Sequence, residues 1–180
     1  MSFAFTFPGQ GSQTVGMGHD LAERFAEARE VFAEVDDALG QKLSEVMWNG
    51  PSDELTLTAN AQPALMAVSL ATMRVAEARG LDLKASIAYV AGHSLGEYSA
   101  LAAAGSLSVG DAARLLRIRG TAMQQAVPVG EGAMAALLGL DFETAAEVAA
   151  EAAGDQVCQA ANDNAPGQVV VSGHKAAVER

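Results

Sequence analysis

The stretch Tyr89–Ala100, which reads YVAGHSLGEYSA, constrains the fold more than any other part of this sequence. Its centre, GHSLG, matches the G-x-S-x-G pattern of a nucleophile elbow, in which a serine lies on a sharp turn between a strand and a helix. The apolar run Ile87–Ala91 is typical of a buried parallel strand, and the Ala- and Leu-rich run Leu95–Ala104 favours a helix. The pattern predicts a nucleophilic Ser94. The alternative is a glycine-bounded turn whose serine only caps the helix.

The elements around this motif predict an α/β fold with a parallel sheet. Phe3–Phe7 alternates like a strand, and three helical patterns cover 20–39, 62–80 and 108–126. Gln62-Pro63 is expected to open the second of these helices, with the proline in the first turn. Ser108–Asp111 spells a capping box for the third. Ser52–Leu55 is expected to be a polar connection.

After Pro128 the pattern changes to β-α-β-β-α. We expect strands at 133–140, 157–161 and 168–172, a helix at 142–153, a turn at NDNAPG, and a helix from His174. This order is a ferredoxin-like unit without its last strand. We therefore expect residues 1–128 to be the N-terminal part of a large α/β domain and 129–180 an incomplete small subdomain. The chain stops in mid-helix without a cap, which is typical of a fragment, although a frayed terminal helix is the alternative.

Composition excludes several classes of function. Eleven Lys and Arg against 22 Asp and Glu give a net charge of −11, which disfavours nucleic acid and anionic membranes as partners. No stretch approaches the roughly 18 apolar residues that span a bilayer, and the N-terminus does not resemble a signal peptide. The single cysteine, Cys158, excludes a disulfide framework, and spaced metal ligands are missing. We expect a cytoplasmic protein without a metal or a membrane partner.

A nucleophilic serine needs a general base, and the sequence offers only three histidines. His93 adjoins Ser94, but neighbouring side chains at a tight elbow point apart. His19 and His174 lie at the starts of helices, where structural roles are expected. The sequence therefore predicts that the base is absent from these residues.

Donors for an oxyanion are easier to place. The rule for elbows assigns one to the backbone N–H of Leu95, and the glycine-rich loop Phe7–Gly11 is the best source of the second. This loop has no G-K-[ST] and misses the G-x-G-x-x-G spacing, so nucleotide binding is not predicted.

Arg119 is the most informative charge. An apolar stripe at helical spacing runs along its helix, and Arg119 falls within the stripe while Arg114 and Arg117 fall off it. The stripe consists of Ala112, Leu115, Leu116, Ala122 and Met123. A guanidinium that faces the interior needs a partner, and a substrate carboxylate is a candidate. The alternative is an arginine that snorkels past Gly120 to solvent. Met123, Met134 and Cys158 are expected to fill the core.

Four segments, PGQGSQ, GHSLGEYSAL, RLLRIRG and NAPGQVVVSG, occur in this order between Pro8 and Gly173. Together they resemble the malonyl-CoA:acyl-carrier-protein transacylases of fatty acid synthesis and the related acyltransferase domains of polyketide synthases. The resemblance implies an α/β-hydrolase-like large domain with an inserted ferredoxin-like small subdomain. It implies a ping-pong reaction in which Ser94 takes the malonyl group from malonyl-CoA and passes it to the phosphopantetheine thiol of acyl carrier protein. Both thioesters are substrates, so no cofactor is expected.

The resemblance also implies roles for individual residues. Gln10 and Leu95 would supply the oxyanion N–H groups, and Arg119 would hold the malonyl carboxylate. Positions near the pocket would be Gln62, Met123 and Asn162. The catalytic histidine of the family lies beyond Arg180, so this piece alone is expected to have little activity. The early first strand is typical of a free-standing enzyme.

Two other functions remain open. A serine esterase or thioesterase would share the elbow but have no need of Arg119. A carrier-protein-binding scaffold, or an inactive acyltransferase fragment, would never acylate Ser94.

Overall fold

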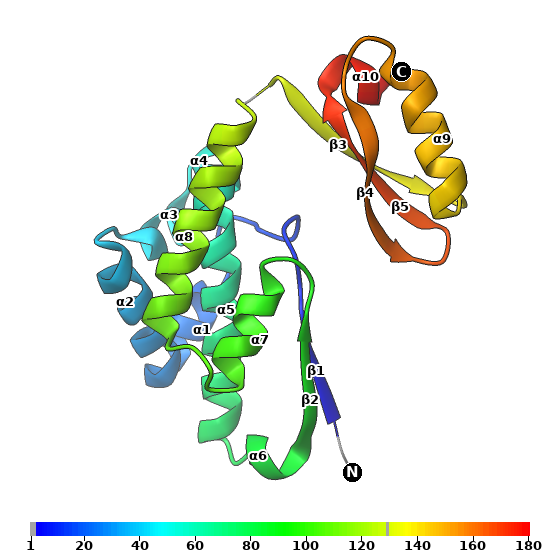
Figure 1. Cartoon of the computed structure of the whole chain (residues 1–180). Coiled ribbons are helices and arrows are strands. Elements are labelled where there is room, and N and C mark those ends of the chain that lie inside the picture. The colour runs from blue at the N-terminus through cyan, green and yellow to red at the C-terminus, as the bar shows by residue number, and fades with distance from the viewer. Residues whose placement is uncertain (1–2, 129) are drawn as a thin grey trace. The chain divides into compact units, whose positions relative to one another are not determined.

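The computed structural model describes residues 3–128 and 130–180 (Figure 1). The chain divides into two compact units, Met1–Gln124 and Gln125–Arg180. The expected boundary at 128/129 adjoins Val129, which lies outside the described residues. The elements of the first unit are β1 (Phe3–Phe7), α1 (His19–Arg24), α2 (Ala26–Leu39), α3 (Leu43–Asn49), α4 (Ser52–Thr56), α5 (Thr58–Ala78), α6 (Leu83–Ser86), β2 (Ile87–Gly92), α7 (Gly96–Ala103) and α8 (Val109–Ala126).

Strands β1 and β2 form a parallel pair, as the sequence predicted (Figure 1). Phe7 at the end of β1 lies opposite Gly92 at the end of β2. Parallel strands end at the same edge of a sheet, so the loop after β1 and the turn after β2 are neighbours. This pairing brings the glycine-rich loop and the serine motif together.

The core of the first unit forms around α5. Its residues from Asn60 to Ala67 are all buried, which explains a helix that shows little amphipathic pattern. Side chains from the surrounding helices, among them Phe32, Leu43 and Leu116, complete the same cluster. Each large apolar side chain buried in this way stabilises the fold by about 1.5–3 kcal/mol.

Three predictions about the helices need correction. Helix α5 begins at Thr58, so Pro63 lies in its second turn, because the burial around it outweighs the loss of one backbone hydrogen bond. Ser52–Thr56 is a short helix rather than a polar connection. The helical range 20–39 is interrupted at Phe25, which is extended (φ −130°).

The predicted cap of α8 forms through the side chain of Ser108. The Ser108 hydroxyl accepts a hydrogen bond from the Asp111 backbone N–H (3.0 Å) and donates to the Asp111 carboxylate (2.7 Å). The hydrogen bond that the Ser108 hydroxyl donates, followed by the bond from the Arg114 guanidinium, holds the pKa of the Asp111 carboxyl below its ordinary value. The box fixes the start of the helix that carries Arg119.

The second unit has the predicted β-α-β-β-α order, in β3 (Gly132–Leu138), α9 (Phe142–Ala153), β4 (Cys158–Ala165), β5 (Gln168–His174) and α10 (Lys175–Glu179). The three strands form an antiparallel sheet in the order β3-β5-β4. Asp141 caps α9 by accepting a hydrogen bond from the Thr144 backbone N–H (2.8 Å). The mixed α/β architecture, with a parallel sheet and a small antiparallel sheet, confirms the predicted fold class.

Two details of this unit differ from the prediction. The residues Asn162–Ala165 continue β4, and the turn is confined to Pro166 and Gly167, the latter with φ 76°. Met134 is 61% exposed rather than buried, because the alternation along β3 turns Ala135 and Leu137 toward the core instead. Cys158 is buried, as predicted. Among the described residues, none of the helices combines the length and apolarity that crossing a bilayer requires.

Candidate active site

Ser94 lies on the turn between β2 and α7, in the strand–turn–helix setting that an elbow requires. Its φ is 54°, and it is the only non-glycine residue with a positive φ in the described part of the chain. A side chain held in this region costs on the order of 1–3 kcal/mol, and such strain concentrates at functional sites. The backbone therefore supports an elbow rather than an ordinary helix cap.

Two glycines make this turn possible. A Cβ on Gly92 would lie 1.9 Å from the carbonyl carbon of Gly96, so the end of β2 approaches the start of α7 directly. A Cβ on Gly96 would lie 2.3 Å from the carbonyl oxygen of Phe7. Since both obstacles are backbone atoms, no side-chain movement could relieve them, and the positions require glycine.

The loop after β1 lies against the elbow. The His93 backbone N–H donates to the Phe7 carbonyl (3.1 Å), and a Cβ on Gly9 would lie 2.5 Å from Nδ1 of His93. The backbone N–H groups of Gln10 and Leu95 have no hydrogen-bond acceptor among the described residues. Two backbone donors from two adjacent loops are what stabilising an oxyanion requires.

Arg119 reaches Ser94 from α8. One guanidinium nitrogen, Nη2, donates to Ser94 Oγ at 2.9 Å, and Nη1 donates to Oε1 of Gln62 at 2.6 Å. The guanidinium carbon lies 6.0 Å from the centre of the Tyr98 ring, within the range of a cation–π contact. The arginine therefore does not snorkel to solvent; it is held beside the nucleophile.

The close approach of α8 to α5 at Gly120 places this arginine. A Cβ on Gly120 would lie 2.6 Å from the carbonyl oxygen of Thr58, so the two helices touch through backbone atoms next to Arg119. Gln62 is fully buried on α5, and its Nε2 donates to Sδ of Met123 (3.3 Å). Three of the predicted site residues, Gln62, Arg119 and Met123, thus belong to one network.

The buried face of α8 is not the predicted one. It consists of Val109, Gly110, Ala112, Ala113, Leu116 and Gly120. Leu115 is 42% exposed and Met123 is 46% exposed, so the prediction that they lie in the core was wrong. The buried face includes the small residues Ala113 and Gly120, and a pattern read from large apolar residues misses them.

The contacts described at Ser94 do not identify a general base. Arg119, which is hydrogen-bonded to Ser94 Oγ, is a cation that cannot accept a proton. His19 lies 4.0 Å from Glu23 and against the ring of Trp48, and Nδ1 of His174 accepts the Val157 backbone N–H. That none of the three histidines is the base remains a prediction.

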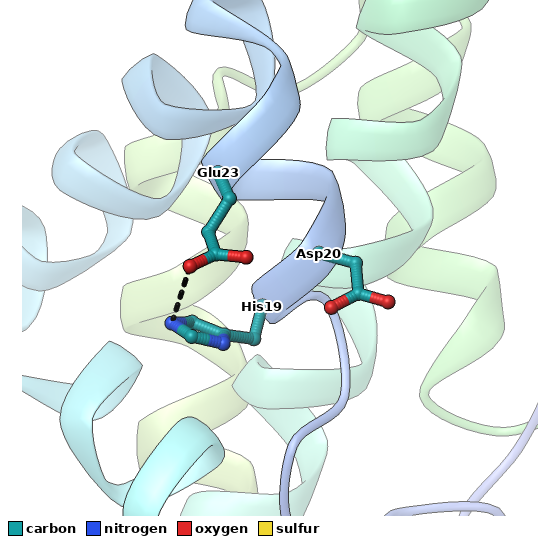
Figure 2. Close-up of side chains that lie close together, drawn as sticks. All are labelled: His19, Asp20 and Glu23. Atoms are coloured by element: carbon teal, nitrogen blue, oxygen red, sulfur yellow. Dashed lines mark ion pairs between the residues drawn. The ribbon is translucent and has the colours of Figure 1, made fainter.

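Two other groups bear on the predictions. Asn162 lies in β4 of the second unit, opposite Val170, and its role near the pocket remains a prediction. His19, Asp20 and Glu23 form an exposed group on α1 whose ligand atoms lie within 4.8 Å of one another (Figure 2). Sequence spacing did not single out this group. Exposed clusters of this kind are common without an ion, so it receives no assignment.

Sequence reasoning also missed Tyr98 and Asn60. Tyr98 follows Ser94 by four residues, about one helical turn, and this spacing could have indicated that its ring lies near the serine. Asn60 precedes Gln62 by two residues and contacts a second arginine of α8, Arg117. No local pattern predicts that contact, because it joins residues 57 positions apart.

The site thus combines a strained serine elbow, a pair of backbone donors and a guanidinium beside the serine. The chain belongs to the acyl transferase domain family, whose model matches residues 4–180. It is 52% identical over 178 residues to the malonyl CoA-acyl carrier protein transacylase of Escherichia coli K12, covering 99% of this chain and 57% of the relative. The corresponding transacylase of Bacillus subtilis is 49% identical over 177 residues, covering 98% of this chain and 55% of the relative.

Solved structures agree with this membership. The acyl-carrier-protein-S-malonyltransferase of Bartonella henselae has a TM-score of 0.92 and 62% identity, covering 99% of this chain and 57% of that one. A malonyl-transacylase in complex with a type II polyketide synthase acyl-carrier protein has a TM-score of 0.90 and 46% identity, with the same coverage. The predicted family and fold class are confirmed. The chain spans 55–57% of the length of these relatives.

Proposed function

We propose that the complete protein transfers the malonyl group of malonyl-CoA to the phosphopantetheine thiol of acyl carrier protein through a malonyl-Ser94 intermediate. The observation that carries the proposal is the hydrogen bond from Arg119 Nη2 to Ser94 Oγ (2.9 Å). A malonyl thioester carries its carboxylate one methylene away from the carbonyl that the serine attacks. A guanidinium that touches the nucleophile is therefore within reach of that carboxylate, and its planar fork suits it.

The site residues divide the chemistry among them. Ser94 Oγ forms a bond to the thioester carbonyl carbon, and its proton passes to a general base. The backbone N–H groups of Leu95 and Gln10 stabilise the tetrahedral oxyanion. The carbon–sulfur bond then breaks, and coenzyme A leaves as a thiol after taking up the proton. In the second half the carrier-protein thiol attacks the malonyl ester by the same steps in reverse, and Ser94 regains its proton.

Other residues support the substrate carboxylate. Gln62 orients the guanidinium of Arg119 through the 2.6 Å hydrogen bond, and Met123 contacts Gln62 in turn. We assign Asn162 to the same pocket on the strength of the family resemblance. We place the general base in a region that corresponds to the remaining length of the relatives, and we expect little activity from residues 1–180 alone.

This reaction also bears on the cofactor requirement, the carrier-protein surface and the cellular location. A thioester is already an activated acyl group, so the reaction needs no cofactor. The net charge of −11 requires that any surface for an acidic carrier protein be locally basic. We also propose a cytoplasmic location, which a single cysteine without a disulfide partner fits.

The test compares Arg119→Ala with Arg114→Ala in the complete protein. A hydrogen bond to a charged group contributes about 1.5–3 kcal/mol, so its loss should lower the rate of malonyl transfer from malonyl-CoA to acyl carrier protein by about 10- to 160-fold. Arg114 is an exposed arginine of the same helix, and its replacement should have no effect. Equal malonyl transfer by Arg119→Ala and wild type would contradict the role proposed for Arg119. Hydrolysis of neutral acyl esters that is equal in the two proteins, without malonyl transfer, would favour an esterase. Failure of a fluorophosphonate probe to label Ser94 would favour a non-enzymatic scaffold.

A further inference from the structure

Arg117 is a half-buried cation whose partners are neutral. Its Nη1 donates to Oδ1 of Asn60 at 2.5 Å, and its Nη2 donates to Oε1 of Gln41 at 2.8 Å. It forms no ion pair with any residue that the structure describes, and burial lowers the pKa of its guanidinium. The arginine one turn earlier, Arg114, is exposed and pairs with Asp111 at 2.6 Å. A cation that is partly desolvated without a carboxylate partner needs an explanation beyond charge pairing.

Asn60 is well placed to hold such a side chain. It is 5% exposed on the first turn of α5, and its Nδ2 donates to the backbone carbonyl of Glu54 at 2.8 Å. This second bond fixes the amide, so that Oδ1 points to Arg117. Through Asn60 and Gln41, Arg117 joins α8 to two other segments of the first unit.

The two arginines flank the buried face of α8. Successive residues of a helix are about 100° apart, so Arg117 and Arg119 are separated by about 200° around the axis. Ala112, Ala113, Leu116 and Gly120, which are all buried, fall in the arc between them. Arg119 bonds to Gln62 on one flank, and Arg117 bonds to Asn60 on the other. Each flank of the α5–α8 contact therefore carries one arginine–amide pair.

We propose that Arg117 is a positioning residue for Arg119: by bonding to Asn60 and Gln41 it fixes the rotation of α8 on α5 and so keeps the Arg119 guanidinium at Ser94. This inference rests on the proposed function, because it concerns the site that would hold the malonyl carboxylate. The Arg119–Gln62 bond holds only one flank of the contact, and the backbone contact at Gly120 lies close to it, so Arg117 supplies the restraint on the opposite flank.

A small rotation of α8 is enough to displace the Arg119 guanidinium. A group at the outer radius of a helix, about 5–6 Å from the axis, moves by about 1 Å when the helix rotates by about 10°. A misplacement of about 1 Å can reduce the rate of a well-oriented reaction by about 100-fold. The loss of one restraint on α8 is therefore enough to affect the carboxylate contact while the fold is kept.

The experiment compares Arg117→Met with Arg114→Met in the complete protein, with malonyl-CoA and with acetyl-CoA as donors. Arg117→Met should raise KM for malonyl-CoA by about 10-fold or more, while KM for acetyl-CoA, which has no free carboxylate, stays within about twofold. Arg117→Lys can reach one amide oxygen but not both, and should recover part of the loss. Arg114→Met should match wild type. A purely structural role of Arg117 would lower the rate with both donors equally, and that result would overturn the proposal, as would wild-type KM in Arg117→Met.

A second measurement does not depend on transfer. The side-chain Nε–H resonance of Arg119, assigned from its absence in Arg119→Lys, should shift in Arg117→Met and stay unchanged in Arg114→Met. If the wild-type protein transferred no malonyl group, the proposed function would fail, and this resonance would still decide whether Arg117 positions Arg119. An Arg119 signal that is identical in wild type and Arg117→Met would refute the inference.

Discussion

Replacing Gly120 by alanine tests whether the backbone contact between α8 and α5 places Arg119. A Cβ there would lie 2.6 Å from the Thr58 carbonyl oxygen and 2.8 Å from Cα of Ala59. At Gly110, in the same helix, the nearest atom would be Cβ of Ala38 at 3.4 Å, an ordinary contact. Replacing glycine by alanine gains up to about 1 kcal/mol of helix propensity in a helix interior, and less at Gly110, which lies in the first turn of α8. A Gly120→Ala variant that is nevertheless the less stable of the two therefore reports a steric cost.

The size of that cost follows from the two distances. Restoring an ordinary separation at Gly120 requires the helices to part by about 0.8 Å, and overpacking of this kind costs about 1–3 kcal/mol. Gly120→Ala should thus be less stable than Gly110→Ala by about 1–3 kcal/mol.

Trp48 is the only tryptophan of the chain and packs against Phe32 in the core of the first unit, so its fluorescence in a urea titration reports the unfolding of that unit. Gly120→Ala should also raise KM for malonyl-CoA, because Arg119 moves with its neighbour. Equal midpoints and slopes for the two variants would show that the contact does not constrain the helix.

Two further predictions concern the elbow and the cap of α9. Ser94→Gly should be more stable than Ser94→Ala by roughly 1 kcal/mol in the same urea titration, because glycine relieves the strain of the positive φ. Both variants lose the hydrogen bond to Arg119, so that loss cancels in the comparison. An alanine variant as stable as the glycine variant would argue against strain. The hydrogen bonds from Thr144 hold the pKa of Asp141 below its ordinary value of 3.8, so the stability that the cap contributes is present above pH 3.8 and is lost as the pH falls through the lowered value. Thermal unfolding followed by circular dichroism should show Asp141→Ala less stable than wild type at neutral pH and the two converging in acid; a gap that persists in acid would mean that the carboxylate is not the cause.

Elements marked by local chemistry could be predicted from the sequence. The Ser108–Asp111 box set the start of α8, and the pattern after Asp141 predicted α9 with the bounds that the structure has. The serine motif predicted its strand, turn and helix, because glycines and a short apolar run mark each transition. In these places the residues that decide the structure are neighbours in the chain.

Contacts between distant elements could not be predicted in this way. Periodicity placed the buried face of α8 on the side of Leu115, whereas the structure rotates that face toward Arg117. The rotation of α8 depends on the contact between Gly120 and the backbone of α5. A pattern of hydrophobic residues carries no information about a contact that depends on the absence of a Cβ. The same reasoning explains why the contacts of Arg119 with Gln62 and Ser94 were found only in the folded chain, where Arg119 lies at the edge of the buried face rather than within it.

The glycines at 9, 92, 96 and 120 have a consequence for mutational maps of this protein. Each has another atom within 2.6 Å of the place where a Cβ would stand, so substitution there should be as poorly tolerated as substitution of Ser94. A scan that scores only growth or activity would therefore mark these glycines and the nucleophile alike. A parallel scan of protein abundance would separate them, because a steric clash depletes the folded protein while loss of a hydroxyl leaves it abundant and inactive.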